Sequence, residues 1–371
     1  MKILVWAPFR GEPSGGVAKH LSQLITSFRE HANVSRVVVI APRGLMSGLD
    51  GLGIQIVRTG PPRFGLSASA DGLRSTEFDV GFSIVARKLP SMGVPVVTTV
   101  YNVEPLQTPV NYHVPLAWRL RLWGLRQENA LACRQAAKVL APSRYTKDLI
   151  ERTLRTPAAK VRVVYPGFHP FEQPDVRQPH LPFGKARFLF AAGSLVPYRG
   201  FEDLIAALGE IRKGGQDIPY AVLAGSAPLA GSYEQDLKAL AQRVGCADRV
   251  VLVGQLNEPE MHWCYEHALA FVQCSRAESF SHTQVEALGH RCVLISCDQP
   301  PMPEVLGEGA AYYRTADPSS LAARLKELLA LSHEAIKARR AQAYERSCQF
   351  RWELCADQTL DTLKAVAAKS S

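Results

Sequence analysis

The 371-residue sequence lacks several features that would assign it to a special class of protein. No stretch approaches the roughly 20 uninterrupted apolar residues that a membrane-spanning helix needs. Its eight cysteines include no C-x-x-C pair and mostly lie in apolar runs. This argues against a disulfide framework or a zinc site and favours buried thiols in a reducing compartment. The start, residues 1–8, is soon interrupted by Arg10 and predicts a β-strand, not a signal peptide.

The remaining composition is that of an ordinary globular protein. Apolar residues make up 47% and charged residues 21% of the chain, which is neither poor in aliphatic side chains nor extreme in charge. These values exclude disorder as a description of the whole. Because a domain typically has about 150 residues, the length suits two domains. We therefore expect a cytoplasmic protein of two domains.

Positive charge is concentrated in the first half of the chain. The formal net charge is +9, yet residues 1–165 hold 22 lysines and arginines against 10 aspartates and glutamates, and the remainder is slightly acidic. Basic surfaces attract polyanions, of which nucleic acid and anionic lipid headgroups are the common ones. Zinc ligands, RNA-binding aromatic motifs and a helix-turn-helix signature are absent from the sequence, so nucleic acid is the weaker candidate.

One basic segment, residues 118–126, interleaves arginines with tryptophan and leucine. As a helix it would have the composition of a helix that lies on a membrane surface. A helix that faces the protein core and whose arginines are solvated is an equally good interpretation. The sequence leaves both open.

Short β-branched runs alternate with longer helical patterns, which predicts parallel sheets covered by helices on both faces. A proline-rich linker at 169–184 separates two such series, so we expect an N-terminal domain at 1–168 and a C-terminal domain at 185–345. Residues 346–371 follow as a C-terminal helix, with an apolar stripe formed by Trp352, Leu354, Leu360, Leu363 and Val366. The clearest strands are residues 2–6, 37–40, 94–100, 138–141, 161–164, 188–191, 221–224, 250–253, 270–273 and 292–296.

Ligands of open parallel sheets bind at the carboxyl ends of the strands, so the loops that follow the expected strands are candidate sites. After the first strand, Gly15 and Gly16 precede a helix and would let backbone N–H groups approach an anion. Residues 193–200 repeat this pattern and add Arg199, a cation that can bind a diphosphate with two N–H groups. A flexible turn and a surface arginine are the plain alternatives. The G-x-G-x-x-G fingerprint of nicotinamide dinucleotide binding is absent.

The strongest constellation is the segment 275–288, in which Glu278 lies in a loop and Glu286 lies one turn inside the following helix. Between the two carboxylates lies a helix N-terminus, whose N–H groups suit a phosphate. Carboxylates on either side of an anion site make sense if each binds hydroxyl groups, one on a sugar and one on a ribose. A capping Glu278 and a solvated Glu286 explain this arrangement less well.

The pair Glu278 and Glu286, with its flanking residues, resembles the signature of the retaining GT-B glycosyltransferases of family 4. Residues 193–200 resemble the phosphate loop of that family, and Gly15 and Gly16 resemble its N-terminal glycine loop. Further segments match in the family's order, at residues 223–226, 250–254, 303–307 and 350–353.

This resemblance implies a GT-B fold, with two facing Rossmann-like doubly wound parallel-sheet domains, a cleft between them, and a C-terminal helix that packs back onto the N-terminal domain. It implies that Glu278 holds the transferred sugar, Glu286 holds the ribose, and Arg199 neutralises the diphosphate. The other residues that it implies for donor binding are Gly15, Gly16, Gly193, Ser194, Gly225, Phe280, Ser281, His282 and Thr283. It implies no metal, in agreement with the absence of a D-x-D pair from the sequence, and no cofactor beside the nucleotide-diphosphate sugar that serves as donor substrate.

Three positions depart from the pattern of this family. Ser194 stands where an arginine is common, and Tyr101 stands where a histidine contacts the donor sugar. His282 replaces an aliphatic residue, and either adds a hydrogen-bond donor near the phosphates or faces solvent. His20 and His113 are further candidates for a role in the first domain.

We therefore expect a cytoplasmic retaining glycosyltransferase, peripheral on the inner face of the membrane, that moves a sugar to a hydroxyl of a glycan or lipid-linked acceptor in cell-surface polysaccharide synthesis. The basic N-terminal domain would bind the acceptor and an anionic membrane surface, with no nucleic acid as partner. A sugar-nucleotide 2-epimerase and a non-catalytic nucleotide-sugar-binding protein are the alternatives.

Overall fold

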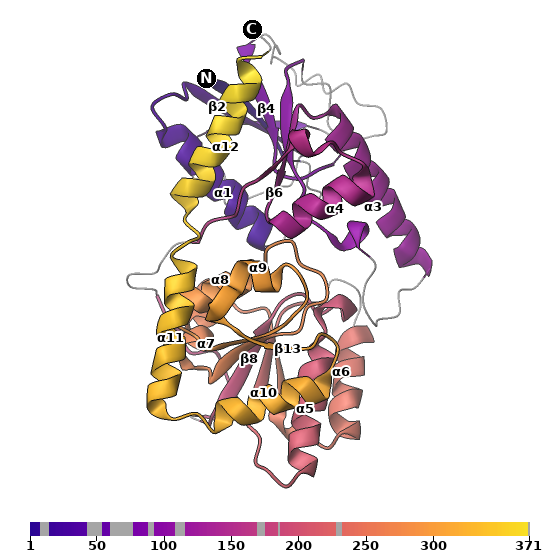
Figure 1. Cartoon of the computed structure of the whole chain (residues 1–371), viewed down its shortest axis with the longest axis vertical. Helices are drawn as coiled ribbons and strands as arrows, with labels where there is room; N and C mark the ends of the chain where they lie inside the picture. Colours follow the sequence, from indigo (N-terminus) through magenta and orange to yellow (C-terminus); the bar gives the residue numbers. More distant parts are fainter. Residues whose placement is uncertain are drawn as a thin grey trace. The chain divides into compact units, whose positions relative to one another are not determined.

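The computed structural model describes residues 1–7, 15–42, 54–59, 77–87, 93–107, 116–168, 175–184, 186–227 and 232–369. The chain divides into two compact units, shown in Figure 1. The first unit holds residues 1–108, 114–167 and 350–371, and the second unit holds residues 109–113 and 168–349. The C-terminal segment therefore belongs to the unit in which the chain begins.

The first unit is built on a seven-stranded parallel sheet in the order β3-β2-β1-β4-β5-β6-β7. Continuous apolar runs form its central strands, because a sheet covered on both faces buries successive side chains on both sides. Ile3, Leu4 and Val5 of β1 are accordingly all buried. The strands are β1 (Lys2–Trp6), β2 (Arg36–Pro42), β3 (Gln55–Thr59), β4 (Val80–Ser83), β5 (Val96–Thr99), β6 (Lys138–Ala141) and β7 (Val161–Val163).

Helices contribute to two separate apolar cores of this sheet. α1 (Gly15–Glu30) and α12 (Trp352–Ala367) pack against each other and share one core. α3 (Leu116–Gln135) and α4 (Arg144–Leu154) contribute side chains to the other. Two short 3-10 turns, η2 (Glu104–Leu106) and η3 (Ala158–Lys160), precede α3 and β7 respectively.

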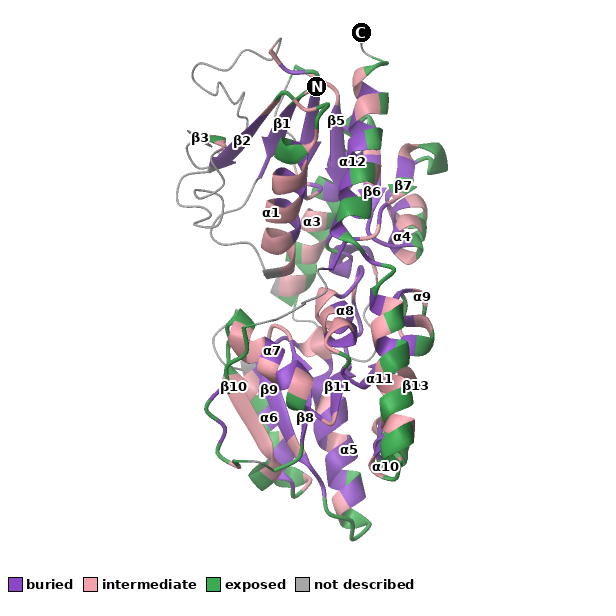
Figure 2. Ribbon diagram, turned by 90° about the vertical axis from the view of Figure 1, so that its left-hand side faces the viewer, coloured by how far each residue is buried: buried purple, intermediate pink, exposed green. Residues whose placement is uncertain are grey.

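The second unit is built on a six-stranded parallel sheet in the order β10-β9-β8-β11-β12-β13. Figure 2 shows its central strands in the colour of buried residues, whereas the edge strand β10 is only partly buried. The strands are β8 (Phe188–Ala192), β9 (Tyr220–Ala224), β10 (Val250–Gly254), β11 (Ala270–Gln273), β12 (Leu294–Cys297) and β13 (Ala311–Tyr313).

In the second unit, α5 (Phe201–Lys213) packs against α6 (Ser232–Arg243) and α10 (Pro318–Leu329), and α8 (His282–Gly289) packs against α11 (His333–Ser347). Its 3-10 turns are η4 (Pro197–Arg199), η5 (Ala247–Arg249) and η6 (Gly307–Gly309). Its helices are α5 (Phe201–Lys213), α6 (Ser232–Arg243), α7 (Glu258–His267), α8 (His282–Gly289), α9 (Met302–Leu306), α10 (Pro318–Leu329) and α11 (His333–Ser347).

The expected proline-rich linker is only partly described, since residues 169–174 and 185 lie outside the described residues. Its described part, residues 175–184, lies against α7. The backbone N–H of Arg177 donates to the carbonyl of Pro259 at 3.0 Å, and Nδ1 of His262 is 3.2 Å from the carbonyl oxygen of Asp175. This stretch is therefore anchored to the second unit.

The two sheets confirm the expectation of two doubly wound parallel α/β domains. The strand patterns did not single out β3, β4 and β13. β3 and β4 mix apolar residues with polar residues or glycine, and β13 consists of an alanine and two tyrosines, so none is a run of aliphatic residues. Seven of the eight cysteines are buried. Within the described part of the chain, no helix combines the length and the apolar character needed to cross a bilayer.

One member of the expected apolar stripe of α12 was wrong. Trp352, Leu360, Leu363 and Val366 are buried, but Leu354 is 41% exposed. Leu354 follows Trp352 by only two residues, so a helix carries it away from the side on which Trp352 packs.

This difference gives a test of the fold with a matched control on the same helix. Leu363→Ala should lower the free energy of unfolding by about 2–5 kcal/mol, because the side chain is fully buried against the first sheet. Leu354→Ala removes the same atoms from an exposed position and should change it by no more than about 0.5 kcal/mol. Urea unfolding of both variants measures the difference, and equal losses would contradict the assigned orientation of α12.

Candidate functional site

The second sheet has a topological switch point between β8 and β11. From β8 the chain proceeds to β9 and β10 on one side of the sheet, and from β11 it proceeds to β12 and β13 on the other. In open parallel sheets a ligand crevice forms where two such connections diverge at the carboxyl ends of the strands. The loops that leave β8 and β11 are the two loops singled out in the sequence, residues 193–200 and 274–281.

Two glycines allow these loops and their neighbours to approach closely. Gly225 has φ +149°, and a Cβ atom there would lie 1.9 Å from the carbonyl oxygen of Gly193. Gly200 has φ +66°, and a Cβ atom there would lie 2.4 Å from the carbonyl oxygen of Cys274. Because the Cβ atom of any other residue would push these backbone segments apart, the close contact depends on glycine at both positions. The structure thus brings Gly193 and Gly225 together.

Arg199 and Glu278 form an ion pair across the two loops. Nη1 of Arg199 donates to Oε1 of Glu278, and the two side chains are only 20% and 11% exposed. Nε2 of Gln273, the last residue of β11, donates to the same oxygen at 3.2 Å. The carboxylate is therefore oriented both by the opposite loop and by the sheet. A guanidinium has five N–H donors, so an arginine can bind a carboxylate and a phosphate together.

Ser281 shapes the N-terminus of α8. It adopts φ +73°, an uncommon backbone conformation for a residue other than glycine, and such strain clusters at functional sites. Its hydroxyl makes no capping bond to the helix and instead accepts hydrogen bonds from Nε2 of Gln284 at 2.8 Å and from Nε2 of Gln273 at 3.3 Å. The partly exposed His282 and Thr283 then begin a helix whose first N–H groups suit an anion.

Phe280 and Ser194 occupy different environments beside this helix terminus. The Phe280 side chain is fully buried, and its ring meets His282 edge-on at a centroid distance of 5.4 Å. The Phe280 side chain is thus not available to a ligand. Ser194 is partly exposed in the loop after β8.

Glu286 lies on α8, one turn beyond its start, and is partly exposed. The hydroxyl of Tyr265 donates to its Oε2 at 3.4 Å. The Tyr265 ring is fully buried and stacks on His290. Burial and the neighbouring Glu286 raise the pKa of Tyr265 well above its usual value, so the hydroxyl remains a proton donor to the carboxylate. Glu278 and Glu286 therefore lie on either side of the N-terminal turn of α8.

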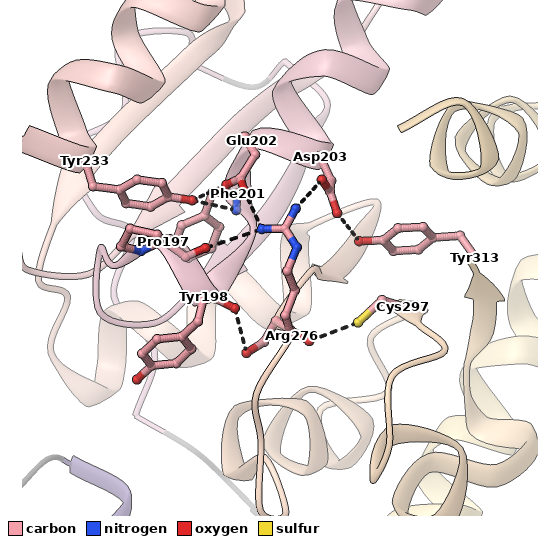
Figure 3. Close-up of polar contacts among 10 residues, drawn as sticks. Pro197, Tyr198, Phe201, Glu202, Asp203, Tyr233, Arg276, Cys297 and Tyr313 are labelled. Carbon is pink, nitrogen blue, oxygen red and sulfur yellow. Dashed lines mark hydrogen bonds and ion pairs between the residues drawn. The ribbon is translucent and has the colours of Figure 1, made fainter. Parts of the chain in front are cut away.

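A buried network behind these residues, drawn in Figure 3, is centred on Arg276. Its side chain is 3% exposed, donates from Nη2 to Asp203 at 2.8 Å and forms a second ion pair with Glu202. The Arg276 backbone N–H donates to the carbonyl of Tyr198 at 2.7 Å. Glu202 and Asp203 are in the first turn of α5, directly after η4. Arg276 therefore fastens the loop that carries Glu278 to the loop that carries Arg199.

Tyrosines complete the hydrogen bonding of this network. Tyr233 donates its hydroxyl proton to Glu202 and accepts the backbone N–H of Phe201 at 3.1 Å, and Tyr313 donates to Oδ2 of Asp203 at 3.4 Å. Burial raises the pKa of Asp203 to about 6, since the loss of hydration outweighs the opposing effect of Arg276. Burial also raises the pKa of Tyr233, so its hydroxyl stays protonated.

In the first unit, Gly15 and Gly16 open α1, while the rest of the preceding loop, residues 8–14, lies outside the described residues. His113 lies outside them as well. Tyr101 is buried, and its hydroxyl forms a hydrogen bond with Nδ1 of His20 on α1. Nε2 of His20 is 3.9 Å from Sγ of Cys355 on α12. The structure therefore joins Tyr101 and His20, two residues that the sequence named separately.

Arg276, Tyr265 and Gln273 are the site residues that sequence reasoning missed. The signal for Arg276 was a basic residue three positions after the end of an expected buried strand, combined with the acidic pair Glu202 and Asp203 at the start of α5. Over the described part of the chain, no three histidine, cysteine, aspartate or glutamate side chains are grouped so that they could hold a metal ion.

Comparisons with known proteins identify relatives over nearly the whole chain. The family model for Glycosyl transferases group 1 matches residues 172–347, and the model for Glycosyltransferase Family 4 matches residues 14–170. An uncharacterised glycosyltransferase of Bacillus subtilis (strain 168), YqgM, is 25% identical over 299 residues, which cover 78% of this chain and 76% of the relative.

Two solved structures share the fold. HepE of Anabaena in complex with UDP-glucose superposes with a TM-score of 0.76 at 19% identity, covering 98% of this chain and 100% of the other. Sucrose-phosphate synthase from Thermosynechococcus elongatus superposes with a TM-score of 0.76 at 17% identity, with complete coverage of both chains. With its two parallel-sheet domains, this chain therefore has the GT-B fold.

The Arg276 network should be essential for the stability of the second unit. Arg276→Met leaves the buried Asp203 and the partly exposed Glu202 without their cation, so the free energy of unfolding should fall by about 3–5 kcal/mol. Arg212→Met, which removes an arginine from its surface pair with Asp248, is the matched control and should cost less than about 1 kcal/mol. Thermal unfolding measures both, and a similar small loss in both variants would contradict the structural role of Arg276.

The raised pKa of Asp203 predicts a specific pH dependence. The carboxyl is harder to ionise in the folded than in the unfolded chain, so its contribution to stability is complete below about pH 4 and is lost as the pH rises through about 6. Asp203→Asn cannot ionise. The stability of the wild type relative to this variant should therefore fall by about 2 kcal/mol between pH 4 and pH 7. Urea unfolding at a series of pH values tests this, and a difference that does not vary with pH would refute it.

Proposed function

Because the chain belongs to the group 1 glycosyltransferases of family 4, which transfer sugars from nucleotide sugars, we propose that it is a retaining, metal-independent enzyme with a uridine-diphosphate sugar as donor. The family assignment agrees with the resemblance carried by Glu278 and Glu286. The observation that carries the finer proposal is the Arg199–Glu278 pair beside the N-terminus of α8, at the switch point of the second sheet.

In this proposal the two carboxylates recognise the two ends of the donor. Glu278 accepts hydrogen bonds from hydroxyls of the transferred sugar, and Glu286 accepts them from the ribose. The diphosphate lies between them at the start of α8, where the backbone N–H groups of Phe280, Ser281 and His282 support it together with Thr283. Gly193, Ser194 and Gly225 let the adjacent backbone approach, and Gly15 and Gly16 contribute from the first unit.

Catalysis then consists mainly of stabilising the leaving group. As the bond between the anomeric carbon and the diphosphate oxygen breaks, negative charge develops on the diphosphate, and Arg199 and the helix terminus stabilise that charge. The acceptor hydroxyl forms its new bond on the same face of the sugar, and its proton passes to an oxygen of the departing phosphate. The configuration at the anomeric carbon is thereby retained. Arg276 contributes as a positioning residue, because it holds both loops.

Uridine is the proposed base because HepE, with the same fold over nearly its whole length, is described in complex with UDP-glucose. The acceptor is proposed to be a glycan or a lipid-linked glycan of cell-surface polysaccharide synthesis, bound by the basic first half of the chain. The proposed location is the cytoplasmic side of the membrane, where such an acceptor would present its anionic head.

The test combines donor binding with two site variants. UDP-sugars should stabilise the protein by about 2.7 kcal/mol at a hundredfold excess over their Kd in a thermal-shift panel of nucleoside diphosphates and their sugars. Arg199→Met should lower kcat by about 10²- to 10³-fold, because a charge-stabilising donor is lost, and Glu278→Gln should lower it similarly. Arg212→Met is again the control and should retain wild-type kcat.

Mass analysis of the products distinguishes the alternatives. Transfer of the sugar to an added acceptor supports the proposal. An altered nucleotide sugar formed from the donor alone would indicate a 2-epimerase, and binding without any turnover would indicate a non-catalytic binding protein. Stabilisation by other nucleotides but not by uridine nucleotides would overturn the choice of base.

A further inference from the structure

Helix α3 carries two apolar faces, and only one of them is used within its own unit. Toward the protein, Ala132 and Cys133 join the apolar core and the indole N–H of Trp118 donates to the buried Glu104 at 3.0 Å. Away from the protein, Leu116, Leu120, Trp123 and Leu131 are 69%, 62%, 64% and 40% exposed. Part of this helix therefore packs on the protein, as the core-facing interpretation expected, and the membrane-surface interpretation stays a prediction.

The exposed apolar residues of α3 lie along one side of the helix, with the polar Gln127 between Trp123 and Leu131. At 100° per residue, positions 116, 120, 123 and 131 fall within an arc of about 80° along the helix. Among the described residues, only six large hydrophobic side chains are highly exposed, and four of them are in this stripe. Single exposed apolar residues need no explanation, but a gathered row marks an interaction surface. We call this row the α3 stripe.

Arginines flank the α3 stripe. Arg119, Arg121 and Arg126 are exposed, and the Arg121 guanidinium lies 4.8 Å from the Trp118 ring centroid. The one acidic residue of the helix, Glu128, is ion-paired with Arg87 at 2.9 Å and so adds little negative charge to this surface. Figure 2 shows intermediate and exposed colours along the visible part of α3.

We propose that the α3 stripe and its arginines form a docking surface for an anionic lipid bilayer. Leucines and a tryptophan beside arginines are the composition of a helix that lies in the headgroup region, with its apolar side chains among the acyl chains and its cations on the phosphates. A second copy of the chain fits less well, because a two-fold contact through this face would bring the same arginines together. This inference deepens the proposed function, since it rests on a lipid-linked acceptor and places the enzyme beside it.

Sedimentation with vesicles tests the surface directly. The full-length protein should bind vesicles that contain phosphatidylglycerol and phosphatidylcholine, bind pure phosphatidylcholine vesicles much less, and lose affinity as salt is raised. Leu120→Gln combined with Trp123→Gln should weaken binding at least about tenfold, because two apolar anchors are lost. Arg119→Gln should weaken it about fivefold. The matched control is Leu354→Gln combined with Val176→Gln, which removes the two large exposed apolar side chains that the described residues hold outside α3 and should leave binding unchanged.

Donor binding separates this inference from the proposed function. The stripe variants should keep the wild-type thermal shift with UDP-sugars, which also shows that they are folded. No binding of the wild type to phosphatidylglycerol vesicles, or equal binding by the stripe variants and the control, would overturn the docking surface and leave the proposed function standing. A wild-type dimer that the stripe variants convert to a monomer would assign the stripe to a second copy and would equally overturn it.

Discussion

The ion pairs of buried Arg276 are the interaction on which the arrangement of the second unit depends. One guanidinium satisfies two carboxylates of the first turn of α5, and its backbone N–H holds the carbonyl of Tyr198. Burying the charges of Arg276 and Asp203 is costly unless each is paired and hydrogen-bonded. The partly exposed Glu202 pairs with the same guanidinium, and two tyrosine hydroxyls supply further bonds to the carboxylates. The desolvation cost of the buried charges is therefore offset only when the guanidinium, the carboxylates and the tyrosine hydroxyls adopt this one arrangement. That geometry sets the distance between the loops that carry Arg199 and Glu278.

The candidate donor site, next to this network, holds charges of opposite sign close together. Arg199 and Glu278 pair with each other, and Gln273 orients the carboxylate from the end of β11. A donor that carries an anionic diphosphate and neutral sugar hydroxyls needs both kinds of partner close together. The helix terminus at Ser281 adds oriented N–H groups without another charge. The proposed chemistry thus relies on side chains held by two loops and by the carboxyl end of β11. Gly200 and Gly225 permit the close contact between the backbones of these loops and their neighbours.

The first unit contributes differently. Its candidate residues Tyr101 and His20 form a hydrogen bond with each other beside the apolar core, so they do not act as two independent groups. A hydroxyl that is already bonded to an imidazole offers a ligand less than the sequence pattern suggested. The distinctive surface of this unit is α3, whose outward leucines and tryptophan are as apolar as its inward face. A single hydrophobic pattern could not reveal which of the two faces the domain would use.

The sequence by itself determined the alternation of strands and helices, and with it the parallel sheets, because apolar runs and helical periods depend on neighbouring residues alone. The spacing of Glu278 and Glu286 also predicted that a helix N-terminus lies between them, for the same local reason. Only the tertiary structure decided that Arg276 would meet Glu202 and Asp203, more than 70 positions away, and that the Trp352 side of α12 would pack in the first unit. Such pairings follow from the order of strands in a sheet and from the packing of faces, and neither is encoded in any short stretch of the chain.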